Sequence, residues 1–237
     1  MPFHGTLPSC IVPLGMIITI DGPAGTGKSS VALALAQRLG FDFLDTGAMY
    51  RAVALEALRR NANLEDAREL AFVGRHCRIN FEWDKHPPTV ILNGESVGHL
   101  LRGGEVTRAA SKVAVVASIR EQLVADQQRI GAEHGKLVTE GRDQGTVVFP
   151  SAPFKFYLDA TPAERAHRRV AQLRARGEIV DHGEILNQIV ARDHRDASRV
   201  VGPLAVAFDA IVIDTTVLTQ EQVVNQMAQR VQASVPR

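Results

Sequence analysis

The stretch that decides the fold is Gly22-Pro23-Ala24-Gly25-Thr26-Gly27-Lys28-Ser29, followed by Ser30. It matches the pattern G-x-x-x-x-G-K-[ST] at every fixed position. A short apolar run precedes it at residues 16–20, and a helical pattern with apolar residues four apart follows as far as Leu39. A strand before and a helix after are the context that this motif requires. We therefore predict a phosphate-binding loop, with Lys28 opening a helix at an exposed strand-to-helix junction.

Each fixed position of the loop has a physical reason. Glycines let backbone amides turn toward phosphate oxygens, and the positive end of the following helix points at them. Lys28 would place a charge at the β- and γ-phosphates of a nucleotide, and the Ser29 hydroxyl would ligate Mg²⁺. We therefore expect ATP and Mg²⁺ at residues 22–30. The alternative, a chance match in a glycine-rich turn, lacks support from the flanking strand and helix.

The composition excludes several classes of protein. The 237 residues are 45% hydrophobic and carry a net charge of +1, which predicts one α/β domain with insertions and no general nucleic-acid or membrane partner. Cys10 and Cys77 form no metal or disulfide pattern, as expected in a reducing cytoplasm. Prolines break the first apolar pieces of the chain. We therefore expect residues 1–15 to be an N-terminal extension and residues 16–237 to be the domain.

The remaining sequence alternates between strand and helix patterns. Strands are predicted near residues 41–44, 136–140, 154–158 and 210–213. Helices are predicted near residues 48–60, 64–74, 106–131, 183–199 and 220–231. A further helix is predicted to begin at the capping box formed by residues 161–164. This alternation predicts a doubly wound parallel sheet. Residues 77–97 differ, because short alternating runs around Asn93-Gly94 predict a small antiparallel sheet inserted into the α/β pattern.

Three further segments narrow the prediction: LDTGAMYR at 44–51, EGRDQGTVVFP at 140–150 and RDHRDASR at 192–199. Together with the loop they resemble the bacterial cytidylate kinases, from about residue 16 to the C-terminal helix. The resemblance implies the nucleoside monophosphate kinase fold, with an acceptor-binding region at about 75–115 and an arginine-rich lid at about 161–199. It also implies Mg²⁺-dependent phosphoryl transfer from ATP to CMP, and to dCMP, by a cytoplasmic monomer.

The resemblance also gives individual positions a role. The residues that it places at the acceptor phosphate, where with Lys28 they would carry catalysis, are Arg51, Arg142 and Arg199. The residues that it places at the cytosine are Thr46, Ser111, Arg120 and Asp143. Arg192 and Asp196 would hold the ribose, and Arg102 matches a further arginine of the family.

The chemistry of the implied reaction calls for these residue types. The acceptor is already an oxyanion, so the site must bring two polyanions together and neutralise charge rather than supply a strong base. Arginine suits this task because its planar fork binds phosphate oxygens in pairs. Asp143 can accept from the cytosine amino group, while Arg120 and Ser111 can donate to the ring acceptors. A uracil carbonyl would instead face Asp143 as acceptor against acceptor.

Some alternatives stay open on the sequence. Asp196 could simply pair with Arg192 one helical turn away, and Glu140 could either approach Mg²⁺ through water or make a structural hydrogen bond. Trp83 is predicted to pack rather than to stack on a base. Two rival functions also remain: another small-metabolite kinase, and a regulatory protein that binds nucleotide without turnover.

Overall fold

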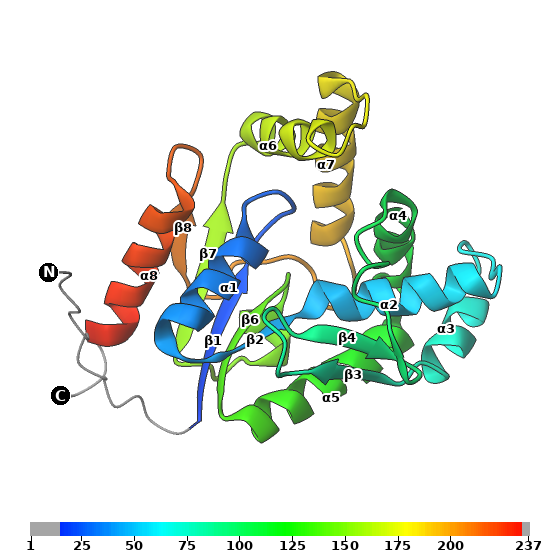
Figure 1. Ribbon diagram of the computed structural model, residues 1–237, viewed down its shortest axis with the longest axis horizontal. Coiled ribbons are helices and arrows are strands. Elements are labelled where there is room, and N and C mark those ends of the chain that lie inside the picture. The colour runs from blue at the N-terminus through cyan, green and yellow to red at the C-terminus, as the bar shows by residue number, and fades with distance from the viewer. Residues whose placement is uncertain (1–14, 234–237) are drawn as a thin grey trace, which may run out of the picture.

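A parallel sheet of five strands forms the centre of the molecule. The computed structural model describes residues 15–233 (Figure 1). The strand order is β2-β6-β1-β7-β8, and all neighbours are parallel. The strands are β1 Met16–Asp21, β2 Asp42–Asp45, β6 Lys136–Glu140, β7 Phe154–Asp159 and β8 Ile211–Asp214. The predicted doubly wound sheet is therefore confirmed.

The carboxyl edge of this sheet is acidic. Ile20 of β1 lies opposite Glu140 of β6 on one side and Phe156 of β7 on the other. The strands end in Asp21, Asp45, Glu140, Asp159 and Asp214. Because β6 and β7 flank β1, the chain changes direction across the sheet at β1, and ligands of such sheets bind outside the strand ends at this point.

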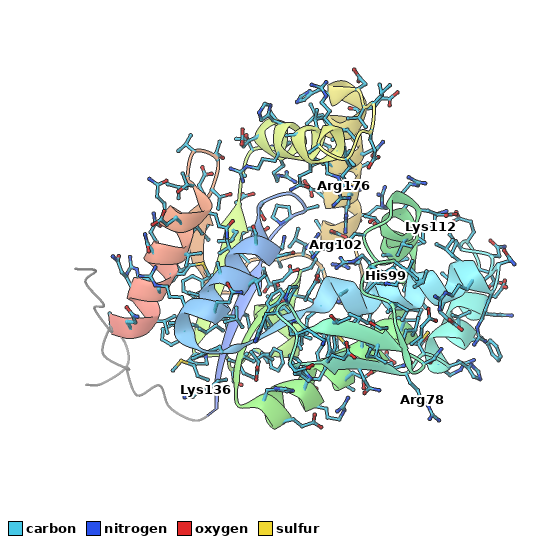
Figure 2. The ribbon with its side chains drawn as sticks, viewed as in Figure 1. Arg78, His99, Arg102, Lys112, Lys136 and Arg176 are labelled. Atoms are coloured by element: carbon cyan, nitrogen blue, oxygen red, sulfur yellow. The ribbon has the colours of Figure 1, made fainter. Side chains whose placement is uncertain are left out.

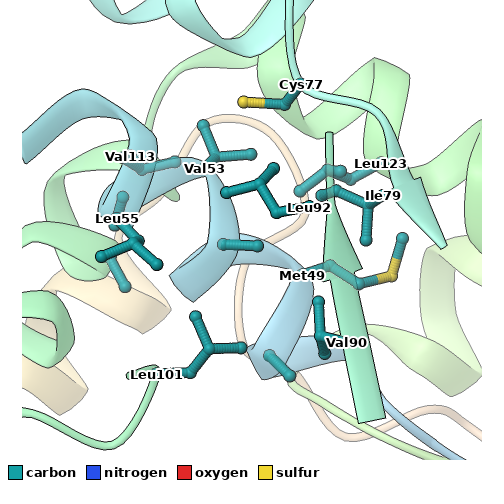
Figure 3. Packing of buried hydrophobic residues seen from close by; sticks show 14 of the residues in the cluster. Met49, Val53, Leu55, Cys77, Ile79, Val90, Leu92, Leu101, Val113 and Leu123 are labelled. Atoms are coloured by element: carbon teal, nitrogen blue, oxygen red, sulfur yellow. The ribbon is translucent and has the colours of Figure 1, made fainter. Parts of the chain in front are cut away.

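Helices cover both faces of the sheet. On one face, α1 Lys28–Leu39 and α8 Gln220–Ala233 pack on β1 and β7 (Figure 1). On the other side, α2 Thr46–Arg59 and α5 Ala117–His134 contact β6. The helices α3 Ala67–Arg75 and α4 Gly104–Val113 pack against α2, away from the sheet. Figure 3 shows Met49 and Val53 of α2 within this second cluster, together with Leu92 and Leu123. Burial of each such side chain contributes about 1.5–3 kcal/mol.

The inserted antiparallel sheet is also confirmed. It consists of β3 Ile79–Glu82, β4 Thr89–Leu92 and β5 Glu95–Ser96, in that order. Asn93 and Gly94 have φ of 51° and 89°, so the tight turn between β4 and β5 places both residues in the left-handed region. The ring of Trp83 lies 3.9 Å from that of His134, between centroids. The tryptophan therefore packs the hairpin against α5, as predicted.

Two helices stand beyond the carboxyl edge of the sheet as an arm, α6 Pro162–Arg174 and α7 His182–Ala197 (Figure 1). The predicted cap is confirmed, because Thr161 Oγ1 accepts a hydrogen bond from the amide of Glu164 at 3.3 Å. The arm has its own small core of Ala166, Val170, Leu173, Ile185 and Ile189. It is thus a compact unit set on the edge where ligands are expected.

The structure corrects several boundaries. The helix predicted at 106–131 is two helices, because the β-branched residues around Val115 and Val116 disfavour helix, and Val116 is extended. The helix predicted from residue 64 begins at Ala67, since Asp66 caps it. A π-helical turn, η1 Gln144–Val148, was not predicted.

Two further points concern the limits of the chain. The predicted extension, apart from Gly15, and Cys10 lie outside the described residues. Over residues 15–233, none of the helices has the length and apolar character needed to cross a membrane.

Candidate active site

The predicted phosphate-binding loop lies between β1 and α1. Gly22 has a φ of 144°, and a side chain there would overlap the backbone oxygen of Leu158 in β7. Gly27, with a φ of 88°, caps α1. Both positions need glycine, because L-residues with side chains rarely adopt these angles. The loop therefore presents backbone amides and the N-terminus of α1 at the switch point of the sheet.

Lys28 is buried, which corrects the prediction of an exposed junction. Its Nζ donates to the backbone oxygen of Pro23 at 2.6 Å, so the side chain folds back over its own loop. Burial, and then the nearby Arg142, lower the pKa of Lys28 to about 7. The loop thus holds a lysine whose charge is destabilised by burial.

Glu140 makes the structural hydrogen bond that the sequence left open. Ser29 Oγ donates to Glu140 Oε1 at 2.7 Å, and burial together with Asp45 raises the pKa of Glu140 to about 7. Hydroxyl and carboxylate oxygens are donors that Mg²⁺ accepts. Over residues 15–233 no group of three or more His, Cys, Asp or Glu residues could hold a metal by itself. The donor set therefore fits a Mg²⁺ ion held by Ser29 beside Glu140 and otherwise by phosphate and water.

Carboxylates hold the predicted acceptor arginines in place. Arg51 Nη2 lies 2.6 Å from Asp45 Oδ2. Burial, the largest single effect, would raise the pKa of Asp45, but the charge of Arg51 together with hydrogen bonds from Glu140 and the Ala48 amide lowers that pKa overall. Asp196 receives a hydrogen bond from Arg142 Nε at 2.9 Å, whereas Arg192 Nε stays 3.9 Å away. The primary partner of Asp196 is therefore Arg142 rather than Arg192.

Several of these arginines keep buried N–H groups without a partner. Within residues 15–233, eight buried side-chain nitrogen or oxygen atoms make no hydrogen bond. Four of the eight belong to predicted acceptor residues: Arg51 Nε, Arg120 Nε, Arg192 Nε and Arg199 Nη2. Buried donors of this kind usually have partners, so their concentration here indicates a site shaped for an anionic or polar ligand.

The predicted base-reading residues Arg120 and Asp143 form a buried ion pair. Arg120 Cζ lies 5.4 Å from the centre of the Tyr50 ring. Gly202, in the segment after α7, lies against both side chains of the pair. Thr46 Oγ1 donates to the backbone oxygen of Glu140 at 2.8 Å, which commits its proton to fixing α2 on β6.

Two predicted residues stand apart from this pair. Ser111 lies half-buried on α4, and Arg102 is exposed in the turn before α4. In Figure 2, Arg102 appears between the lower end of α7 and the insertion. Within the described part of the chain, neither residue hydrogen-bonds to Arg120 or Asp143.

Sequence reasoning missed a link between the arm and the loop. Arg165 is buried on α6, donates to the backbone oxygen of Ala24 at 3.1 Å and lies 2.6 Å from Asp193 of α7. Thr215 Oγ1, beyond β8, donates to the backbone oxygen of Thr26 at 3.2 Å. Their long-range partners give no local pattern. For Asp21 and Asp45 a signal existed, since each directly ends a strand at the ligand edge.

Comparisons with known proteins agree with this geometry. A family model described as cytidylate kinase matches residues 18–233. A cytidylate kinase of Pelotomaculum thermopropionicum is 46% identical over 91% of this chain and 96% of its own length. A cytidylate kinase of Pasteurella multocida is 44% identical over 92% and 95%. In structure, an uncharacterised protein of Eubacterium ventriosum is similar, with a TM-score of 0.50, 14% identity and coverage of 92% and 99%.

That structural likeness concerns the fold alone, whereas the sequence matches span both the phosphate loop and the arginine cluster. With its family model over residues 18–233 and relatives above 40% identity along nearly their whole length, the chain belongs to the cytidylate kinase family.

Proposed function

We propose that this protein transfers the γ-phosphoryl group of ATP to CMP. The observation that carries the proposal is the set of unpartnered arginine N–H groups at the same sheet edge as the phosphate loop. The loop suits the donor phosphates, and the arginines suit a second phosphate facing them. The curated relatives that bear the name cytidylate kinase support CMP as the acceptor.

The residues of the site would act by positioning and by charge. Lys28 would leave the Pro23 carbonyl for the β- and γ-phosphates, while Arg51, Arg142 and Arg199 would hold the acceptor phosphate. Mg²⁺, held by Ser29 beside Glu140, would supply neutralisation of phosphate charge. Asp45 and Asp196 would keep the arginines oriented until the phosphate arrives. No general base is required, because the acceptor oxygen is already ionised.

Base choice would depend on the pair Arg120–Asp143. Asp143 would accept from the cytosine amino group, and Arg120, with Ser111, would donate to the ring acceptors. Thr46 borders the base. Arg192 and Asp196 would contact the ribose, and Arg102 would add charge from the insertion. In UMP, a uracil carbonyl would replace the amino group that donates to Asp143. Two acceptors would then face each other, which disfavours UMP.

The same proposal gives the two outer parts of the fold their roles. Residues of about 75–115 would be the acceptor-binding subdomain, and residues of about 161–199 the lid. The enzyme would also accept dCMP, act as a cytoplasmic monomer, and bind neither nucleic acid nor membrane, in keeping with a net charge of +1. Light scattering after size exclusion would test the monomer.

The test of the function is ADP release from MgATP with CMP, dCMP, UMP, AMP or GMP as the acceptor. We expect CMP to give the highest kcat/KM, with dCMP next and UMP well below both. Turnover with only another monophosphate or a small metabolite would contradict the assignment. Binding of ATP without turnover of any acceptor would favour a regulatory protein instead.

The lowered pKa of Lys28 predicts that ATP binding takes up a proton. Because burial lowers the pKa of Lys28 far below its ordinary value, we expect the neutral amine to predominate at about pH 8. Phosphate charge favours the protonated amine and raises that pKa, so binding should draw in up to about one proton. Calorimetry of MgATP binding in buffers of different ionisation enthalpy measures this number.

The matched control for proton uptake is Lys28→Arg, because a guanidinium stays protonated throughout. The variant also keeps a cation beside Glu140, whose pKa depends in part on the charge of Lys28. Equal proton uptake in the wild type and in Lys28→Arg would show that Lys28 is already charged before ATP binds.

A further inference from the structure

Asp21 is a buried carboxylate to which the proposed chemistry gives no task. It ends β1, directly precedes Gly22 of the phosphate loop, and is only 4% exposed. Its Oδ1 accepts the amide of Gln144 at 2.8 Å, and its Oδ2 accepts the amide of Gly145 at 2.7 Å. The two amides open the turn η1, directly after Arg142 and Asp143 in the chain.

The position of Asp143 before this turn makes these two bonds informative. An aspartate at such a position normally caps its own turn, with its side chain accepting the amide two or three residues on. Asp143 makes no such bond. The carboxylate of Asp21 occupies the Gly145 amide, which such a cap would take, as well as the Gln144 amide beside it, and Asp143 pairs with Arg120 instead.

The charges keep the two carboxylates apart. The pKa of Asp21 is raised to about 6, chiefly by burial and also by the negative charge of Asp143, although the amides of Gly145 and Gln144 lower it. Above that pKa, Asp21 is an acceptor on both oxygens, which matches two N–H donors. Repulsion from Asp21 and attraction from Arg120 then both direct Asp143 away from the turn.

The rest of the turn is held by other groups. Thr139 Oγ1 of β6 donates to Gln144 Oε1 at 2.9 Å, and Gln144 Nε2 donates to Gln127 at 3.0 Å. A side chain at Gly145 would come within 3.0 Å of Thr19 Oγ1 and 3.2 Å of Lys155 Cδ. The turn is therefore packed without Asp21. What Asp21 adds is the capping of the two amides.

We infer that Asp21 is a positioning residue for base recognition: by capping the turn in place of Asp143, it leaves the Asp143 carboxylate to face Arg120 and the acceptor base. The inference deepens the proposed function and rests on it, because it assumes that Asp143 reads the base. It links the end of β1, where the donor site begins, to the choice of acceptor.

The test is Asp21→Asn, compared with Thr139→Val. Asparagine can accept only one of the amides and sets its NH₂ group against the other, so Asp143 is drawn to the uncapped amide. We expect the CMP/UMP ratio of kcat/KM to fall by about tenfold or more, chiefly through the KM for CMP, with the KM for MgATP changed less than about threefold. Thr139→Val loosens the same turn but leaves both amides capped. It should lower Tm and keep the CMP/UMP ratio.

A double variant tests whether Asp21 affects base selectivity through Asp143. In an Asp143→Asn background, Asp21→Asn should change the CMP/UMP ratio no further, because the side chain on which it acts is already altered. Equal losses with CMP and UMP, or the same loss of ratio in Thr139→Val, would overturn the inference and make Asp21 structural. Asp21→Ser provides a second variant. If neither Asp21 variant folds, Asp21 is a folding determinant and the inference fails.

The activity of the wild type distinguishes a failure of the proposed function from a failure of the role inferred for Asp21. If it does not phosphorylate CMP in preference to UMP, the proposed function itself fails, whatever the variants do. If it does, and Asp21→Asn keeps the same preference, only the role of Asp21 is wrong.

Discussion

Lys28→Ala is expected to lower kcat by about a hundredfold to a thousandfold or more, the scale for removing one charged donor from a developing oxyanion. Lys28 is the cation that the loop itself provides, and its Nζ lies 2.6 Å from the backbone oxygen of Pro23. That contact holds the amine against the loop to which we assign the phosphates of ATP. Steady-state kinetics with MgATP and CMP measures the loss.

The protein should stay folded without this amine. Burial lowers the pKa of Lys28, which means that the fold bears a cost for the charge and loses little when it is removed. Lys28→Met serves as the control, because it keeps the aliphatic stem that packs in the loop while removing the charge. Both variants should melt near the wild-type temperature and share the same low kcat. A near-normal kcat in either variant would show that the loop does not perform the proposed chemistry.

The fold could be predicted largely because its signals are local. Strand β6 was predicted at its observed bounds, since residues 136–140 form a short apolar run between a glycine and an acidic end. The turn at Asn93-Gly94 and the cap at Thr161 were predicted because turn and cap chemistry acts over two to four residues. The break between α4 and α5 was not predicted. It depends on three β-branched residues around Val115, and these do not interrupt the helical periodicity of the sequence.

The residues of the site could be predicted from the sequence, but the contacts between their side chains could not. The arginines were predicted because three segments of the sequence resemble those of a known family. Their hydrogen-bond partners lie far away in the sequence, as the pair of Arg142 and Asp196 shows. The burial of Lys28 was missed because pattern alone does not show that its side chain bends back over the loop. The place of Asp21 at the end of a strand was visible in the sequence, but its hydrogen bonds were not, since its carboxylate oxygens accept from amides more than a hundred residues away. Tertiary contacts of this kind have no local pattern.

Asp143→Asn should collapse the preference for CMP over UMP while keeping the shape of the site. The amide can turn its NH₂ group toward a uracil carbonyl, so UMP gains a donor where it met an acceptor. With CMP, the loss of a charged acceptor should cost about 1–3 kcal/mol of transition-state binding. We therefore expect kcat/KM to fall about tenfold for CMP and to hold or rise for UMP. Arg142→Ala is the comparison, because both substrates carry the phosphate that Arg142 would bind, and both should weaken alike.

Asp143→Ala should have a second and larger effect, on folding. Arg120 is only 2% exposed and forms an ion pair with Asp143, so truncating the aspartate leaves a buried charge unpaired. Removing one partner of such a pair costs about 3–5 kcal/mol of unfolding free energy. Asp143→Asn keeps a hydrogen-bond acceptor for Arg120 and should lose less unfolding free energy, which denaturant melts of the two variants will show.

If the alanine variant is as stable as the wild type, Arg120 finds another partner. If the asparagine variant lowers kcat/KM by the same factor for CMP and UMP, selectivity must instead come from Ser111 and Arg120.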